Sequence, residues 1–396
     1  MNAAWLLSGA LPLVMAASAA MAQEVDLHGY VEAELVGTPA DRSWTDGGLG
    51  KLRWGGQNGD ARVTPELSAL LLEGSARLPL DLRASADIRY DPAQKSAIDL
   101  IDATLRWQPP ADGPWIWTAR IGAFFPPFSQ ENNDIGWSSP WTLTYSALDS
   151  WLGEELRTIG GEAGLRWHDD DDQLGLTAAL YGWNDPAGVL IAEHGWDIGN
   201  RALGLFDHAR RPTPPGVPAA YTTEFDELDD TPGWYAQAIW EHQGLGRFEL
   251  DRYDNEADPS AERDDVYGWR TRFWSLGYAR SLGPFHVIAQ GLTGSTEIRP
   301  DGLGPFITDF YTGYMLVGWT DDPWRAALRL ETFGTGRFLQ EHGRAVTASL
   351  NWQPEDWLRL TAEVVAIDSW RTERLAFGDR PRQIEVEPQL GLRLLF

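Results

Sequence analysis

The sequence predicts an all-β fold: a closed antiparallel transmembrane β-barrel of about sixteen strands. Three observations support it. Apolar and polar residues alternate along most of the chain, the alternating segments are joined by connections that are short and long in turn, and tryptophans gather near the short connections. Beyond the N-terminus, the 396 residues contain no run of about 20 apolar residues, which a transmembrane helix would need.

The first 22 residues differ from the rest of the chain. Residues 3–20 are apolar or small, and Ala20-Met21-Ala22 before Gln23 has the pattern of a secretory cleavage site, although no Lys or Arg precedes it. We therefore predict a signal peptide over residues 1–22 and a mature barrel over residues 23–396. A retained anchor helix is the alternative.

Composition excludes several functions. The 58 Asp and Glu against 32 Lys and Arg give a net charge of -26, so we expect no nucleic-acid partner, because phosphate binding needs a basic surface. The chain has no cysteine, which excludes disulfides, thiolate metal sites and cysteine nucleophiles. The acidic runs lack the spaced ligands of a calcium loop, so we expect neither a bound metal nor a cofactor.

Period-two alternation indicates each strand. In residues 25–36, for example, Val25, Leu27 and Val31 share one face, while Asp26 and Glu32 share the other. The predicted strands are residues 25–36, 63–78, 80–90, 98–108, 115–125, 158–168, 172–184, 232–242, 245–255, 266–280, 284–297, 307–320, 323–335, 343–354, 356–370 and 380–396.

The connections predict the orientation. Short ones carry turn residues, as at Pro79, 108–114 and 283–284, whereas the connections between them are longer, as at 37–62, 126–157 and 185–231. Outer-membrane barrels have short periplasmic turns and longer extracellular loops. An even number of strands then returns the C-terminus to the periplasm.

The tryptophans favour the same topology. An aromatic belt is expected where a barrel meets the membrane interface, and eight tryptophans lie close to the short turns. They are Trp107, Trp115, Trp167, Trp240, Trp319, Trp324, Trp352 and Trp357, of which only Trp357 falls in the polar phase. The alternative is a soluble β-sandwich or propeller, but the chain lacks the fully buried apolar strands and the blade repeat that these folds favour.

The last eight residues, 389–396, alternate and end in Phe396. With the signal peptide and the sixteen amphipathic strands, this ending resembles the Gram-negative outer-membrane porins, whose terminal Phe is an assembly signal for the barrel assembly machinery. Residues 120–128, RIGAFFPPF, also look like the strand-five region of phosphate-selective porin O/P-like proteins. Those proteins line their constriction with Lys and Arg, whereas this chain has only Lys51 and Lys95, so phosphate selectivity is not carried over.

If the apolar phase faces lipid, the other phase faces the lumen. The candidate pore-lining residues are Arg83, Asp87, Arg89, Arg106, Arg120, Arg166, Arg329 and Arg359. By resemblance, residues 126–157 fold inward as a constriction loop, which carries Glu131, Asp134, Asp149, Glu154 and Glu155 against Arg157. This acidic excess predicts weak cation selectivity. Alternatively, these carboxylates are solvated or pair with wall arginines to hold the loop.

These features predict a Gram-negative outer-membrane porin for passive diffusion of small hydrophilic solutes or ions, and not an enzyme. Its expected partners are outer-membrane lipid, lipopolysaccharide and the barrel assembly machinery, and a homotrimer is left open. A structural or adhesive barrel that uses residues 185–231 is the first alternative. An outer-membrane hydrolase is the second, although the seven histidines are scattered and no G-x-S-x-G or HExxH motif is present.

Overall fold

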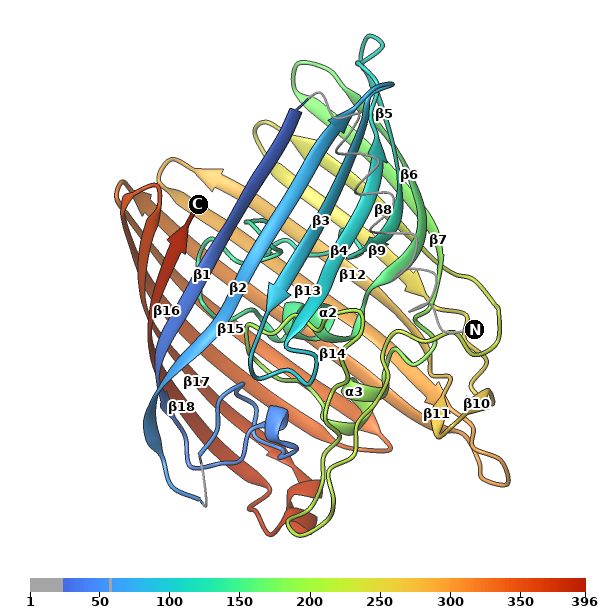
Figure 1. Cartoon of the computed structure of the whole chain (residues 1–396), viewed down its shortest axis with the longest axis vertical. Coiled ribbons are helices and arrows are strands. Elements are labelled where there is room, and N and C mark those ends of the chain that lie inside the picture. Colours follow the sequence, from blue (N-terminus) through green and yellow to red (C-terminus); the bar gives the residue numbers. More distant parts are fainter. Residues whose placement is uncertain (1–23, 57–58) are drawn as a thin grey trace.

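The computed structural model describes residues 24–56 and 59–396, so the predicted signal peptide lies outside the described residues. Sixteen antiparallel strands form one closed barrel, in which each strand pairs with its neighbours along the chain and β1 pairs with β18 (Figure 1). The predicted fold class is therefore confirmed.

Every predicted strand has a counterpart in the barrel. The barrel strands are β1 (Glu24–Thr38), β2 (Arg62–Leu78), β3 (Leu82–Tyr90), β4 (Ile98–Trp107), β5 (Trp115–Phe124), β6 (Thr158–His168), β7 (Asp172–Gly182), β8 (Gly233–His242), β9 (Gly246–Asp254), β12 (Arg270–Leu282), β13 (Phe285–Ile298), β14 (Phe306–Asp321), β15 (Trp324–Arg337), β16 (Glu341–Glu355), β17 (Leu358–Arg371) and β18 (Arg382–Leu395). The largest difference is at the predicted strand 266–280. Its first residues belong instead to a small hairpin of β10 (Glu262–Arg263) and β11 (Val266–Tyr267).

The remaining elements lie in the long connections. They are the 3₁₀ helices η1 (Trp44–Asp46) and η2 (Thr372–Phe377) and the α-helices α2 (Ala147–Glu155) and α3 (Val189–Glu193). None of the described helices has the length and apolar character needed to cross a membrane. We refer below to the barrel end with the short connections as the turn end and to the opposite end as the loop end.

The outer wall is apolar. On β15, Leu328 is 46% exposed and Leu330 is 43% exposed, whereas the intervening Arg329 is fully buried inside the barrel. Six of the predicted belt tryptophans are exposed near the turn end, namely Trp107, Trp115, Trp240, Trp324, Trp352 and Trp357. Apolar side chains on the outside with polar ones inside are the inverse of a soluble protein and suit a barrel surrounded by lipid.

The chain closes the barrel at its last residue. The backbone N–H of Gly29 donates to the carbonyl of Phe396 at 3.0 Å, and the N–H of Phe396 donates back to Gly29 at 3.0 Å. A side chain at Gly29 would collide with the Leu71 carbonyl and the Phe396 ring, because an added Cβ would lie 2.3 and 2.7 Å from them. Glycine here lets the terminal residue pair, which leaves neither β1 nor β18 as an open edge in lipid.

The two faces of the wall should differ in their tolerance of charge. Leu330→Lys places an ammonium on the apolar outer face and should destabilise the barrel by about 2 to 4 kcal/mol. Ser85→Lys places it inside, beside Asp87 and the lumen cavity, and should cost less than about 1 kcal/mol. Urea unfolding of both variants in lipid vesicles measures the contrast. Equal losses would contradict the assignment of the two faces.

Candidate functional site: the barrel lumen

Three connections from the loop end turn into the barrel and pack against one another (Figure 1). They are residues 39–56, 125–157 and 183–232, and their side chains Leu52, Trp151 and Trp196 belong to one buried cluster with wall residues such as Phe310. Backbone hydrogen bonds join the three segments, from Ile198 to Lys51 and from Tyr145 to Gly199, each at 2.8 Å. The loop-end part of the lumen therefore contains a packed core.

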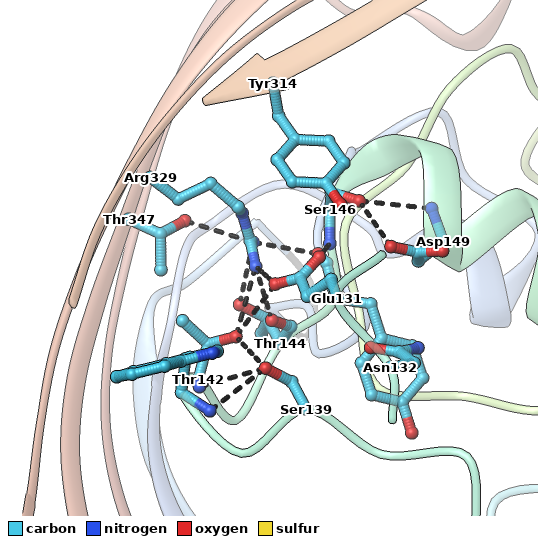
Figure 2. Close-up of polar contacts among 12 residues, drawn as sticks. Glu131, Asn132, Ser139, Thr142, Thr144, Ser146, Asp149, Tyr314, Arg329 and Thr347 are labelled. Carbon is cyan, nitrogen blue, oxygen red and sulfur yellow. Dashed lines mark hydrogen bonds and ion pairs between the residues drawn. The ribbon is translucent and has the colours of Figure 1, made fainter. Parts of the chain in front are cut away.

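Arg329 anchors the second segment to the wall (Figure 2). Its guanidinium pairs with Glu131 at 2.5 Å and with Glu331 at 2.7 Å, and it donates to the carbonyls of Thr144 and Tyr145 at 2.8 Å. Glu331 also accepts a hydrogen bond of 2.8 Å from the N–H of Ala147, the first residue of α2. One buried arginine thus fixes both the start of the constriction loop and the start of its helix.

Two further wall residues hold the same loop. The carboxylate of Glu363 accepts the backbone N–H groups of Leu143 and Thr144 at 2.7 and 3.0 Å. Arg359 pairs with Asp134 at 3.0 Å. Since Glu331, Glu363 and Arg359 all point inward from β15 and β17, the loop lies against this side of the wall.

The three acidic residues of α2 are buried. Burial raises the pKa of Asp149 well above its usual value, and the nearby Glu131 carboxylate raises it further. Burial also raises the pKa of Glu154, beside Asp197, and it raises the pKa of Glu155 to about 7. Glu155 accepts the N–H of Leu190 at 2.7 Å, which links α2 to the start of α3. These carboxyls hold packed segments together.

The long connection 185–231 lies mostly inside the barrel. Residues 184–205 are buried apart from the partly exposed Glu193, and Trp196 donates its indole N–H to the carbonyl of Gly334 at 3.0 Å. Its exposed residues are Phe206, the stretch 215–221, and Asp230 and Thr231 next to β8. The adhesive alternative assumed that this connection extends outward, but its Pro-rich and acidic composition does not distinguish an outer loop from one that packs inward.

On the turn side of the constriction loop lies a polar cavity of about 940 Å³. Three cross-strand rows line its wall on β2, β3 and β4. The row nearest the turn end is basic, with Arg83 opposite Arg106, and Arg106 opposite Arg120 on β5. The next row is formed by hydroxyls, and the third is acidic, with Glu73, Asp87 and Asp102 side by side.

The predicted pore-lining residues separate into two groups. Arg83, Asp87, Arg106 and Arg120 line the cavity, and Arg120 also pairs with Glu162 at 2.8 Å. Arg89 and Arg329 point inward but contact the inward segments, and Arg359 contacts the constriction loop. Arg166 lies on β6, near the turn end. Of the predicted loop carboxylates, Asp134 lines the cavity, while Glu131, Asp149, Glu154 and Glu155 are buried.

Other cavity residues were absent from the predicted site. Glu73 shares the inward phase of β2, so the alternation already indicated it. Gln130 and Trp141 come from the constriction loop, where no periodic pattern specifies the direction of a side chain. Their positions depend on how the loop packs.

Comparison with known proteins identifies the fold. No family model and no curated protein matches the sequence. Similar solved structures include the outer-membrane channel DcaP of Acinetobacter baumannii (11% identity, TM-score 0.56, 94% of this chain and 97% of that chain). An anion-selective porin from Comamonas acidovorans is also similar (12% identity, TM-score 0.55, 94% of this chain and 99% of that chain). OmpT in its trimer form, an outer-membrane protein of Vibrio cholerae, is similar as well (9% identity, TM-score 0.53, 94% of this chain and 99% of that chain). At these identities the likeness establishes the fold, which is that of outer-membrane porins.

Removing Arg329 should strongly destabilise the protein. Arg329→Met leaves Glu131 and Glu331 buried without their partner, and breaking such a buried pair costs about 3 to 5 kcal/mol. Arg344→Met, which removes an exposed pair with Asp368, should cost less than about 1 kcal/mol and is the control. Urea unfolding followed by tryptophan fluorescence measures both. A loss at Arg329 no larger than at Arg344 would contradict the anchoring role.

The packing of the inward segments should weaken as pH rises. Burial raises the pKa of Glu155 and of Asp197 to about 7, whereas such groups ionise near about pH 4 in an unfolded chain. Their contribution to stability is therefore complete below about pH 4 and is lost as pH rises through about 7. Hydrogen exchange of residues 184–205, corrected for its intrinsic pH dependence, should show less protection at pH 8 than at pH 6. Glu155→Gln should flatten this change, and protection that increases with pH would contradict the account.

Proposed function

We propose that the protein is an outer-membrane channel through which small hydrophilic solutes or ions diffuse passively. The observation that carries this proposal is a polar cavity of about 940 Å³ inside a closed barrel whose outer wall is apolar. An apolar exterior stabilises the barrel in lipid, and a polar interior provides hydrated groups along a solute path. The similarity to outer-membrane porin structures supports the same proposal.

The passage should be narrow. The three inward segments occupy much of the loop-end lumen, so a solute has to pass beside them and not through an open cylinder. We therefore expect a smaller conductance than the circumference of a sixteen-strand barrel alone would allow.

We retain the weak cation preference but assign it to different residues. The loop carboxylates are buried or paired, whereas Glu73, Asp87 and Asp102 lie side by side on the cavity wall. Neighbouring carboxylates repel one another, and a permeating cation relieves that repulsion. Of the opposing arginines, Arg120 is already paired with Glu162, and Arg83 lies 3.6 Å from Asp26.

The proposed location is the Gram-negative outer membrane, with the turn end in the periplasm. The exposed ring of Phe396 at the closing strand supports a role as the signal read by the barrel assembly machinery. Lipopolysaccharide and outer-membrane lipid are the proposed surroundings. A homotrimer is part of the proposal, and the trimer form of the Vibrio cholerae protein supports it.

One observation favours a hydrolase as the second candidate. The hydroxyl of Ser281 lies 2.9 Å from Nδ1 of His286, and both residues line the cavity. The second ring nitrogen of His286 lies 3.4 Å from the hydroxyl of Thr320, where a catalytic triad would have a carboxylate. Because Ser281 and His286 are direct cross-strand partners, a simple wall hydrogen bond explains their contact, and the channel remains the better-supported function.

Planar-bilayer recording in a salt gradient tests the proposal. The unmodified protein should conduct, with potassium more permeant than chloride. The double variant Asp87→Asn and Asp102→Asn should shift the reversal potential toward chloride, most strongly in dilute salt, because screening shortens to about 8 Å at physiological ionic strength.

The matched control removes two carboxylates from an exposed turn, with Asp170→Asn and Asp171→Asn, and should leave the reversal potential unchanged. Absence of any conductance would contradict the channel. Conductance with an unchanged reversal potential in the cavity variant would contradict the role of the acidic row alone.

A further inference from the structure

An arginine interrupts the apolar outer face of β9. Phe248 and Leu250 point outward, and the next outward residue is Arg252. Its guanidinium lies over the exposed ring of Trp274 at 5.3 Å from the ring centre and donates to the Phe273 carbonyl at 3.1 Å. An arginine on the lipid face costs about 2 to 4 kcal/mol at the membrane midplane and much less near an interface. The position of Arg252 therefore indicates that a polar or anionic group lies beside it at the same depth in the membrane.

Arg252 belongs to a basic cluster at the loop end. Arg270 and Arg272 begin β12 on the same outer face, beside the last residue of β9, Asp254. Asp254 is shared by Arg252 and Arg270, both at 3.4 Å, and Arg270 also pairs with Glu256. Arg272 is exposed and forms no ion pair within residues 24–56 and 59–396. The chain as a whole has a net charge of -26, yet here the three arginines outnumber the two carboxylates, Asp254 and Glu256, that pair with them.

A groove in the outer wall leads to this cluster. Its volume is about 550 Å³, its sides include Trp117, Leu176 and Trp234, and Arg252 and Trp274 close one end. A second hollow of about 660 Å³ adjoins it and shares Trp234. The bulky side chains flank a cross-strand row whose members are smaller, Ala119, Ala163, Ala178 and Ala236.

The groove crosses the wall obliquely. The same cross-strand row continues from Ala236 to Arg252 and then to Trp274. The row starts at Ala119, which is four residues from Trp115, the end of β5 at the turn end of the barrel. It reaches Trp274, which is eight residues from Leu282, the corresponding end of β12. The groove therefore rises from the turn end toward the loop end, and the arginines lie at its upper end.

We propose that this groove binds one acyl chain of a phosphorylated glycolipid of the outer leaflet, with a lipid phosphate held by Arg252, Arg270 and Arg272. The apolar sides suit a hydrocarbon chain, and guanidinium groups bind phosphate through charge-assisted hydrogen bonds. The arrangement of charge above and hydrocarbon below matches a lipid in the leaflet on the loop side. A second copy of this chain would present its own apolar wall to the groove and would leave Arg272 without an anion. The inference rests on the proposed membrane location, not on channel activity.

Native mass spectrometry of the full barrel in nonionic detergent, incubated with lipid A, tests the proposal. The barrel should retain lipid A, and much less of the same lipid after its phosphates have been removed, while inorganic phosphate alone should not compete. Arg272→Gln should lower retention about ten-fold, the effect of losing one charge-assisted hydrogen bond. Arg344→Gln, an outward arginine on β16, should leave retention unchanged.

The groove has its own variant and control. Filling it with Ala178→Leu and Ala236→Leu should lower retention to the level of the dephosphorylated lipid, whereas Ala362→Leu on the outer face of β17 should not. Conductance should be unchanged in all of these variants, which separates failure of this proposal from failure of the channel. Equal retention in the filled variant and the parent would overturn the proposal. Loss of an oligomer in the filled variant, with lipid retention unchanged, would identify a second copy of the chain as the occupant.

Discussion

The buried contact of Arg329 with Glu131 and Glu331 determines how the interior of this barrel is arranged. A closed barrel holds its wall together through strand pairing alone, so nothing in the wall requires a loop to enter it. The buried guanidinium of Arg329 does require it. Its hydrogen bonds to two carboxylates and two backbone carbonyls form only when residues 131–147 lie against β15. The orientation of α2, and the segments that pack on it, follow from this anchor.

The anchor also redistributes charge within the lumen. An acidic loop in an open pore would present its carboxylates to passing ions, but here burial and pairing remove Glu131, Asp149, Glu154 and Glu155 from the water-accessible space. The acidic row of Glu73, Asp87 and Asp102 remains on the cavity wall. The acidic residues of the lumen thus form two groups: one holds the inward segments together, and the other lines the cavity.

The sequence predicts the barrel well because lipid and the lumen are different solvents, and every strand records that difference in alternate residues. The same alternation places Leu330 outside and Arg329 inside. It does not say what an inward side chain meets: Arg83 and Arg329 share the inward phase, yet Arg83 lines a cavity and Arg329 is fully buried against a loop. That difference depends on contacts between residues such as Arg329 and Glu131, which are 198 positions apart. The direction of residues 185–231 was equally inaccessible, because their packing partners lie as far apart in the chain as Lys51, Glu155 and Gly334.

The central claim is that the lumen is divided into a packed loop-end core and a water-accessible turn-end cavity. The chain has no cysteine, so a single introduced cysteine reports whether a thiol reagent reaches that position, and no other residue is labelled. With the barrel in sealed vesicles, a membrane-impermeant thiol reagent supplied at the turn end should label a cysteine at Ser85 rapidly. It should label a cysteine at Ser150, which lies on α2 and is buried against Gly199, far more slowly from either side. Equal labelling at the two positions would contradict the division of the lumen on which this account depends.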